Sequence, residues 1–311
     1  MTRVLVTGGT GFIGSHLVSG LTKSAEFDVV VFDTGKPGKQ QQTSGAKYIL
    51  GSMSNSVQIE QTLKAHDIEV VYHLAWNSIH ETSLENTAAD LEANLLGTVN
   101  LFEACRKNGV RRVIFMSSGG TVYGLPDTLP ISESQATHPI CAYGVTKLAA
   151  EKYLGLFQHL YGLEGVIMRP SVPYGPGQEP ARRQGAIAVF IDRVMRSEPI
   201  TIWGDGSSLR DYFYVGDMVD PLINAISIPA DVNNIFNLGG SQAFTLRDLI
   251  SNIEHTLNLK ASVTFEPARN FDVPELTLDC RRAKSKIGWQ PDTGLEEGIL
   301  LTEQWMRNRL G

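Results

Sequence analysis

The sequence contains few cysteines for its length. Three occur in 311 residues, at Cys105, Cys141 and Cys280, and they are widely spaced and odd in number. This pattern argues against both a disulfide framework and a cysteine-based metal cluster. We therefore expect no metal site and a reducing compartment, the cytoplasm.

The sequence also lacks the features of membrane and nucleic-acid proteins. No run approaches the roughly 20 apolar residues that span a bilayer, and the N-terminus enters a strand-like segment without a signal-peptide pattern. The formal net charge is -6 and the pI is about 5.7, which disfavours anionic partners. We expect neither a membrane nor a nucleic-acid partner.

What the chain does contain is an ordinary globular composition. Hydrophobic residues make up 42% of it and charged residues 19%. A chain of this length can bury a large core and forms one big domain or two lobes.

A glycine-rich turn follows the first strand-like segment, Arg3–Thr7. Two readings of its spacing fit dinucleotide binding, namely Gly9, Gly11 and Gly14, or Gly8, Gly11 and Gly14. Glycines there let the backbone approach a pyrophosphate, which the N–H groups of the next helix then bind. The turn precedes an amphipathic segment, as this interpretation requires.

Asp33 ends the second expected strand, 28–32, and lies 19 residues after Gly14. A carboxylate at this place accepts hydrogen bonds from the adenosine ribose and repels a 2′-phosphate, which favours NAD over NADP. The alternative is a turn residue before Thr34 and Gly35. Lys36 and Lys39 lie close enough to keep NADP open.

Strand-like and helical segments alternate through the first half of the chain. Further strands are expected at 47–50, 69–75, 113–116 and 165–168. Such alternation predicts an α/β fold, a Rossmann-type doubly wound parallel sheet with helices on both faces. We assign residues 1–170 to this dinucleotide-binding domain, with a strand returning near 234–240.

The alternation breaks after Pro170. The stretch 173–178 is rich in Pro and Gly and is expected to be a loop at the cleft. Residues 171–311 then predict a smaller C-terminal α/β lobe that binds the substrate, with helices near 187–196, 245–256 and 295–308 and strands at 200–203 and 262–265.

Tyr143 and Lys147 are four residues apart, so a helix places both on one face. An ammonium near a phenol favours the phenolate, which would make Tyr143 a general base. With nine tyrosines in the chain, a chance pair of this spacing is common. The interpretation gains weight from the hydroxyls of Ser117, Ser118 and Thr121, which follow strand 113–116 at the sheet edge where ligands bind.

Two other residues have alternative readings. Segment 87–108 has helical spacing, and Asn94 within it is either a solvated helix residue or an anchor for the catalytic helix. Trp76 either narrows the pocket or packs in the core.

Several motifs together resemble the extended short-chain dehydrogenase/reductase family, specifically its NAD-dependent sugar-nucleotide epimerases of the UDP-glucose 4-epimerase type. The similar segments cover nearly the whole chain in order: TGGTGFIG at 7–14, Asp33, VYHLA at 71–75, NLLGTVNLFEA at 94–104, SSGGTVYG at 117–124, Tyr143 with Lys147, RPSVPYGPGQ at 169–178, WGDGSSLRDYFYV at 203–215 and AKSKIGW at 283–289.

The resemblance implies bound NAD and a catalytic cycle on a nucleotide sugar. In it, Tyr143 takes a proton from the sugar 4-hydroxyl, Lys147 lowers the tyrosine pKa and binds the nicotinamide ribose, and Thr121 or Ser118 contacts the sugar oxygen. The cofactor-binding positions implied are Gly8, Gly11, Phe12, Ile13, Gly14, Asp33, Ser52, Met53, Leu74, Ala75, Trp76, Asn94, Ser117, Tyr143, Lys147 and Pro170.

The resemblance also implies substrate contacts in the small lobe. Arg210 and Arg269 correspond to diphosphate-binding arginines, and a guanidinium suits forked contacts with phosphate. Thr201 and Trp203 lie where the family contacts the uracil, although a strand packing into the lobe explains their side chains equally well.

The chain departs from the family pattern at some positions. The usual catalytic hydroxyl position is Gly119, so the role moves to Thr121, which we favour slightly, or to Ser118. Val172 replaces an asparagine, Ser52 replaces an adenine-contacting carboxylate, and Leu276 corresponds to the position that gates N-acetyl groups. The sugar therefore stays open.

Family dehydratases and decarboxylases place acidic residues after the catalytic hydroxyl, for use as general acid and base. This chain has Gly119, Gly120 and Thr121 there, which favours epimerisation. The alternatives are a UDP-uronate epimerase, a 4-ketoreductase or dehydrogenase, and a non-catalytic dinucleotide sensor. The apolar helix 146–161 predicts a homodimer, because helices at this position pair across a two-fold axis in the family.

Overall fold

The structure is a computed structural model, and it describes residues 1–36, 42–77, 83, 86–182, 185–268 and 273–310. Two residues named above, Lys39 and Arg269, lie outside the described residues. In the described part of the chain, no helix is both long enough and apolar enough to cross a lipid bilayer.

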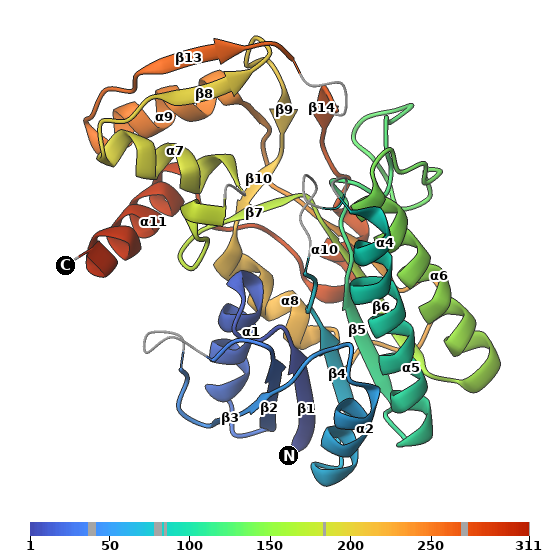
Figure 1. Cartoon of the computed structure of the whole chain (residues 1–311). Coiled ribbons are helices and arrows are strands. Elements are labelled where there is room, and N and C mark those ends of the chain that lie inside the picture. The colour runs from blue at the N-terminus through green and yellow to red at the C-terminus, as the bar shows by residue number, and fades with distance from the viewer. Residues whose placement is uncertain (37–41, 78–82, 84–85, 183–184, 269–272, 311) are drawn as a thin grey trace.

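A parallel sheet forms the centre of the molecule and confirms the expected Rossmann-type fold (Figure 1). Its seven strands are, in spatial order, β11 (Ile235–Leu238), β6 (Glu164–Pro170), β5 (Arg112–Met116), β4 (Val70–His73), β1 (Thr2–Thr7), β2 (Phe27–Asp33) and β3 (Ala46–Leu50). The strand order reverses between β1 and β4, and open sheets bind ligands at such a switch point.

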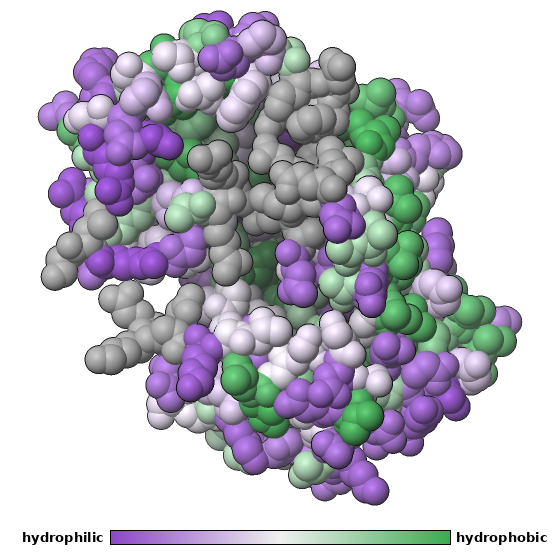
Figure 2. Space-filling model, in the orientation of Figure 1, coloured by the Kyte–Doolittle hydropathy of each residue, from purple (hydrophilic) through white to green (hydrophobic). Residues whose placement is uncertain are grey.

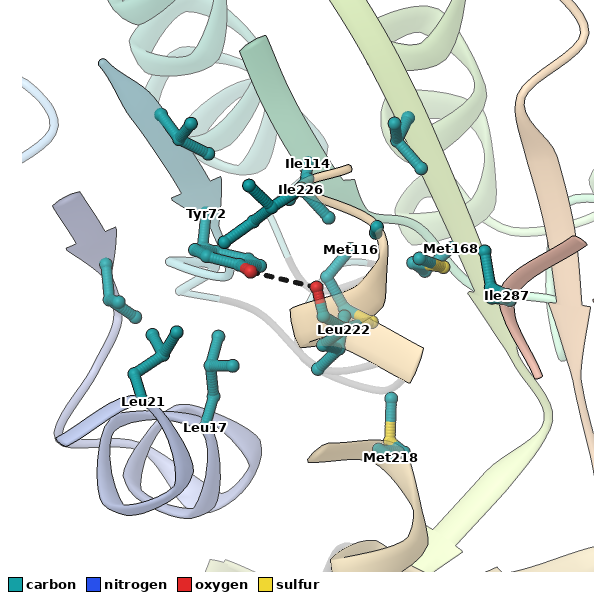
Figure 3. Packing of buried hydrophobic residues seen from close by; sticks show 14 of the residues in the cluster. Leu17, Leu21, Tyr72, Ile114, Met116, Met168, Met218, Leu222, Ile226 and Ile287 are labelled. Carbon is teal, nitrogen blue, oxygen red and sulfur yellow. Dashed lines mark hydrogen bonds between the residues drawn. The ribbon is translucent and has the colours of Figure 1, made fainter. Parts of the chain in front are cut away.

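Helices cover both faces of this sheet, and their apolar sides form two cores (Figure 1). One face carries α1 (Phe12–Thr22), α8 (Val219–Asn224) and α10 (Arg281–Ile287), and the other carries α2 (Ser56–Ala65), α5 (Gly97–Lys107) and α6 (Ala142–Tyr161). Figure 3 shows the first core, where the Tyr72 hydroxyl donates a hydrogen bond of 2.8 Å to the backbone oxygen of Leu222. This bond ties the sheet to α8.

The segment expected as one helix over 87–108 is divided into three parts. A short α4 (Thr87–Asp90) is followed by a π-helix, η1 (Leu91–Leu96), and then by α5. π-turns inside helices are rare overall, but those that occur are often found at functional sites. Here the π-turn carries Asn94, which is buried.

The small lobe lies beyond the carboxyl ends of the large sheet's strands (Figure 1). Its elements are β7 (Val172–Tyr174), η2 (Pro180–Arg182), α7 (Ala186–Met195), β8 (Ile200–Trp203), β9 (Leu209–Arg210), β10 (Tyr212–Tyr214), β12 (Phe244–Thr245), α9 (Leu246–Leu257), β13 (Val263–Glu266), β14 (Glu275–Leu276) and α11 (Leu295–Leu310). The short helix η3 (Val215–Met218) leads back to the large lobe, where Met218 joins the first core. Helices α7, α9 and α11 share a separate core with β8.

The expectation that 173–178 is entirely a loop was wrong for its first two residues. Pro173 and Tyr174 belong to β7, which pairs in parallel with β10. The partner strand lies about 40 residues further along the chain, so local composition does not reveal the pairing.

The chain also returns to the large sheet after the first part of the small lobe, where β11 pairs in parallel with β6.

Candidate active site

Helix α6 positions Tyr143 and Lys147. The helix begins just after Cys141, whose sulfur accepts a hydrogen bond from the Gly144 backbone N–H at 3.4 Å. Tyr143 therefore lies in the first turn and Lys147 one turn later, where its ammonium donates a hydrogen bond of 2.6 Å to the Met116 backbone oxygen at the end of β5. The helix and the strand end thus hold the pair together.

A cavity of about 650 Å³ lies at this edge of the sheet. The predicted site residues that line it are Gly11, Phe12, Ile13, Leu74, Trp76, Ser117, Ser118, Thr121, Tyr143, Lys147, Pro170 and Arg210. The predicted site residues outside its lining are Gly8, Gly14, Asp33, Ser52, Met53, Ala75, Asn94, Thr201 and Trp203. The Tyr143–Lys147 pair, the glycine turn and Arg210 therefore share one cavity.

The glycine turn fits the diphosphate of a dinucleotide. Gly8 has a φ of +74°, and a Cβ on it would lie 2.6 Å from the Ala75 backbone nitrogen. A Cβ on Gly14 would lie 2.2 Å from the Gly8 backbone oxygen. Gly11 is the N-cap of α1 and has no side-chain cap bond, and the first turn of the helix has no acidic residue. The positive end of the helix is thus available to an anion.

Asp33 organises the rim of the cavity at the end of β2. Its two carboxylate oxygens accept backbone N–H bonds from Thr10 at 3.0 Å and from Gly35 at 3.1 Å. Thr10, Gly35 and Lys36 themselves line the cavity. Asp33 therefore fixes the glycine turn to the loop that follows β2.

The proton affinities of Tyr143 and Lys147 differ from the expectation. Burial raises the pKa of Tyr143 above its ordinary value, and Cys141 and Asp90 raise it further. Burial also lowers the pKa of Lys147 well below its ordinary value, against the charges of Glu151 and Asp90. Lys147 thus does not by itself bring the Tyr143 pKa down to working pH, because desolvation of both groups opposes the charged pair.

The hydroxyls after β5 are placed in three different ways. Ser117 is buried and donates a hydrogen bond to the Glu151 carboxylate. Ser118 lines the cavity and is half-buried. Thr121 also lines it, and its hydroxyl oxygen is buried without a hydrogen-bond partner among the described residues.

Gly119 faces away from the cavity. A Cβ there would lie 2.8 Å from the Arg169 backbone oxygen and 2.6 Å from the Leu278 side chain. This position packs on β6 and on the segment that follows β14, so a side chain here would point into those neighbours. The nearby residues Ser118 and Thr121 line the cavity, whereas Gly119 is not among its lining residues.

Asn94 is a buried anchor, the second of its two predicted readings. Its amide nitrogen donates to Asp90 at 2.8 Å, and its amide oxygen accepts from the Asn77 backbone N–H at 2.8 Å. The other oxygen of Asp90 accepts from the Thr146 hydroxyl at 2.9 Å. The π-turn is thereby joined to the helix that carries Tyr143 and Lys147.

Comparison with known proteins identifies the family. A family model described as the NAD dependent epimerase/dehydratase family matches residues 4–239. The chain belongs to this family.

Individual members are similar along the full length. A putative UDP-glucose 4-epimerase of Methanocaldococcus jannaschii is 34% identical, with 98% of each chain covered. A dTDP-4-dehydro-6-deoxyglucose reductase of Escherichia coli is 34% identical, with 95% of each covered. The crystal structure of the Thermotoga maritima UDP-glucose 4-epimerase with UDP-glucose has a TM-score of 0.95 at 34% identity, with 100% of each chain covered.

In this member of the family, the residues predicted for substrate contact are divided. Arg210 lines the cavity and donates to the Val273 backbone oxygen at 2.5 Å. Thr201 and Trp203 lie on β8, outside the lining, and Trp203 is 45% exposed. The structure therefore brings only Arg210 of these three to the cavity.

Sequence reasoning did not name several lining residues as site residues. These are Thr10, Gly35, Lys36, Met116, Gly120, Ser171, Val172, Pro173, Gly177, Gln178, Glu179, Gly185 and Val273. For the lining residues between Pro173 and Gln178, a signal was available, because this Pro- and Gly-rich stretch was expected to form a loop at the cleft. Leu276, by contrast, is buried in a small core beside Tyr123 and lies outside the lining.

Proposed function

We propose that this protein catalyses the NAD-dependent 4-epimerisation of a nucleotide sugar, a UDP-hexose or a UDP-N-acetylhexosamine, through a transient 4-keto sugar. The observation that carries the proposal is the meeting of Tyr143, Lys147 and the glycine turn in one cavity. The full-length similarity to UDP-glucose 4-epimerases supports it.

The chain's residues supply binding and proton transfer. NAD, when bound, accepts and returns the hydride. Gly8, Gly11 and Gly14 admit its diphosphate, and Asp33 lies where a ribose hydroxyl is bound. The Tyr143 oxygen takes the proton from the sugar 4-hydroxyl and returns it after the 4-keto sugar has turned over. Lys147 supplies positive charge beside it.

The small lobe holds the other end of the substrate in this proposal. Arg210 lines the cavity, and a guanidinium is suited to binding the diphosphate of the sugar nucleotide. We accordingly assign residues 1–170 mainly to the cofactor and 171–311 mainly to the sugar nucleotide.

Replacing Tyr143 by phenylalanine tests the proposal. With UDP-glucose or UDP-N-acetylglucosamine, we expect Tyr143→Phe to lose turnover by several orders of magnitude and to retain NAD in the purified protein. Tyr153→Phe, an exposed tyrosine on the same helix, is the matched control and should keep activity. Near-normal epimerisation by Tyr143→Phe would end the proposal.

A reductase is the second candidate. It is favoured by the similarity to the Escherichia coli dTDP-4-dehydro-6-deoxyglucose reductase. An epimerase leaves NAD unchanged overall, whereas a 4-ketoreductase or dehydrogenase consumes or produces NADH in each cycle. Stoichiometric NADH change with a nucleotide sugar would select this candidate.

We further infer a homodimer formed through the outer face of α6 and η1. Leucines on this face are about half exposed, namely Leu91, Leu96, Leu156 and Leu160, and hydrophobic surface gathers on the side where α6 lies (Figure 2). Burying such a surface favours association. We expect light scattering at micromolar concentration to give a dimer mass and Leu156→Lys with Leu160→Lys to give a monomer. A monomeric wild-type protein would contradict the inference.

The proposed compartment is the cytoplasm. The described cysteines are all free thiols, which suits a reducing environment.

A further inference from the structure

Trp76 lies directly against the catalytic lysine. It follows strand β4, and the Lys147 ammonium nitrogen lies 3.6 Å from the centroid of its ring. The Tyr143 ring meets the same indole edge-on, with the centroids 6.1 Å apart. Trp76 is thus in contact with both members of the catalytic pair and lines their cavity.

Lys147 has little water around it. Its side chain is buried, its nitrogen donates to the Met116 backbone oxygen, and the Phe115 ring lies 5.0 Å away. A buried amine loses hydration and favours its neutral form. The face of an indole attracts a cation, and this attraction strengthens when water is excluded.

We propose that Trp76 is a positioning residue that holds Lys147 as a charged ammonium beside Tyr143. This inference rests on the proposed function, because it concerns the charge that acts on the catalytic phenol. The ring also fills the space beside the ammonium, so the lysine nitrogen is kept at the end of β5 and within 5.7 Å of the Tyr143 ring centroid.

Other charged groups act on the pair from neighbouring elements. Asp90 from α4 and Glu151 from α6 favour the ammonium. Cys141 and Asp90 oppose ionisation of Tyr143. His73 of β4 faces Lys147 and is itself kept neutral, with a pKa of about 3 that burial and the lysine charge lower. None of these residues is changed by a substitution at position 76.

Loss of the Trp76 indole should change the pH dependence of activity. Without the indole, the ammonium is less stable and loses its proton at lower pH. Tyr143 then has less positive charge beside it, so the phenol ionises at higher pH. The pH range of activity should narrow from both sides, whereas a purely structural role would lower activity at every pH equally.

Kinetics of Trp76→Leu and Trp76→Phe test this with UDP-glucose and added NAD. We expect the acidic limb of the kcat profile to rise by about one pH unit in Trp76→Leu. Phenylalanine keeps a weaker cation-binding face, so Trp76→Phe should show a smaller rise and carries the test if Trp76→Leu does not fold. Phe102→Leu changes the same core and should move neither limb. The proposal would be overturned if neither Trp76 variant shifted the limbs of the kcat–pH profile, or if Phe102→Leu shifted them by the same amount.

Tryptophan fluorescence provides a readout that needs no turnover. A tryptophan whose ring faces an ammonium should change its emission when that ammonium loses its proton. Titration of the purified protein should show a step that is absent from both Trp76→Phe and Lys147→Met. A step that persists in Lys147→Met, or no step in the wild type, would contradict the inference. The fluorescence titration does not depend on turnover. If the protein did not epimerise UDP-glucose, the proposed function would fail, but the interaction of Trp76 with Lys147 could still be tested.

Discussion

The hydroxyl of Thr146 donates a hydrogen bond of 2.9 Å to Asp90, and both side chains are buried. Asp90 also receives the Asn94 amide. One carboxylate therefore joins the π-turn to the helix that carries Tyr143 and Lys147, and it holds negative charge close to that pair. This buried contact links η1 to α6.

Thr146→Val should destabilise the protein by about 1–3 kcal/mol, because the buried Asp90 carboxylate loses one of its hydrogen-bond donors. Urea unfolding at neutral pH measures this change. Thr146→Ser keeps the hydroxyl and should lose less stability. Equal stability of the valine variant and the wild type would show that Asp90 does not depend on this bond.

A second buried contact lies behind the hydroxyl cluster. Arg169 of β6 donates to Glu151 of α6 at 2.9 and 2.5 Å, and each side chain is 2% exposed. Glu151→Gln leaves the guanidinium buried without its counter-charge and should cost about 3–5 kcal/mol. The exposed pair of Glu103 and Arg106 provides the comparison.

Glu103→Gln should change the unfolding free energy very little, since exposed ion pairs contribute little. Similar losses from the two glutamine substitutions would mean that burial does not strengthen the dependence of Arg169 on Glu151.

We expect the buried His73 to lower the free energy of unfolding in acid. It is buried between Thr7 and Thr98, with hydrogen bonds of 2.8 Å to each hydroxyl, and burial first and the Lys147 charge second lower its pKa to about 3. The unfolded chain has a histidine pKa of about 6.5, so between these values the unfolded state binds more protons. The free energy of unfolding should fall as pH decreases from about 6.5, by roughly 2 kcal/mol between pH 7 and 5 from this residue alone.

Unfolding in urea at pH 7 and 5 tests this contribution. His73→Asn should reduce the pH dependence relative to the wild type. The same dependence in the wild type and in His73→Asn would rule out His73 as its source.

The proposed catalytic role of Thr121 or Ser118 can be tested by two small substitutions. We expect Thr121→Val to lower kcat about a hundredfold, because it removes the hydroxyl proposed to contact the sugar oxygen. Valine has the same shape as threonine, and the Thr121 hydroxyl has no hydrogen-bond partner among the described residues. Ser118→Ala should have a smaller effect. The opposite ranking in initial-rate measurements with UDP-glucose would assign the role to Ser118.

Much of the fold followed from local sequence pattern. The strand β1 and the turn with Gly8, Gly11 and Gly14 were predicted because their chemistry is contained in a short segment. Asp33 was predicted to contact the cofactor from its distance along the chain after Gly14. The structure adds that both of its carboxylate oxygens bind backbone N–H groups of adjacent loops.

Contacts between distant segments were not predictable in this way. The pairing of β7 with β10 joins a Pro-containing segment to one about 40 residues away, and composition alone indicated a loop. The π-turn in segment 87–108 likewise has no signature in the spacing of its apolar residues, because Asn94 is fixed by Asn77 from another segment.

By itself, the sequence determined the family, the parallel sheet and the presence of a tyrosine and a lysine on one helix face, since each depends on residue type and spacing along the chain. Only the tertiary structure decided the proton affinities of that pair, the burial of Asp90 and Glu151 and the placement of Trp76 against Lys147. Electrostatic energies depend on distance and on exclusion of water, and folding alone fixes both.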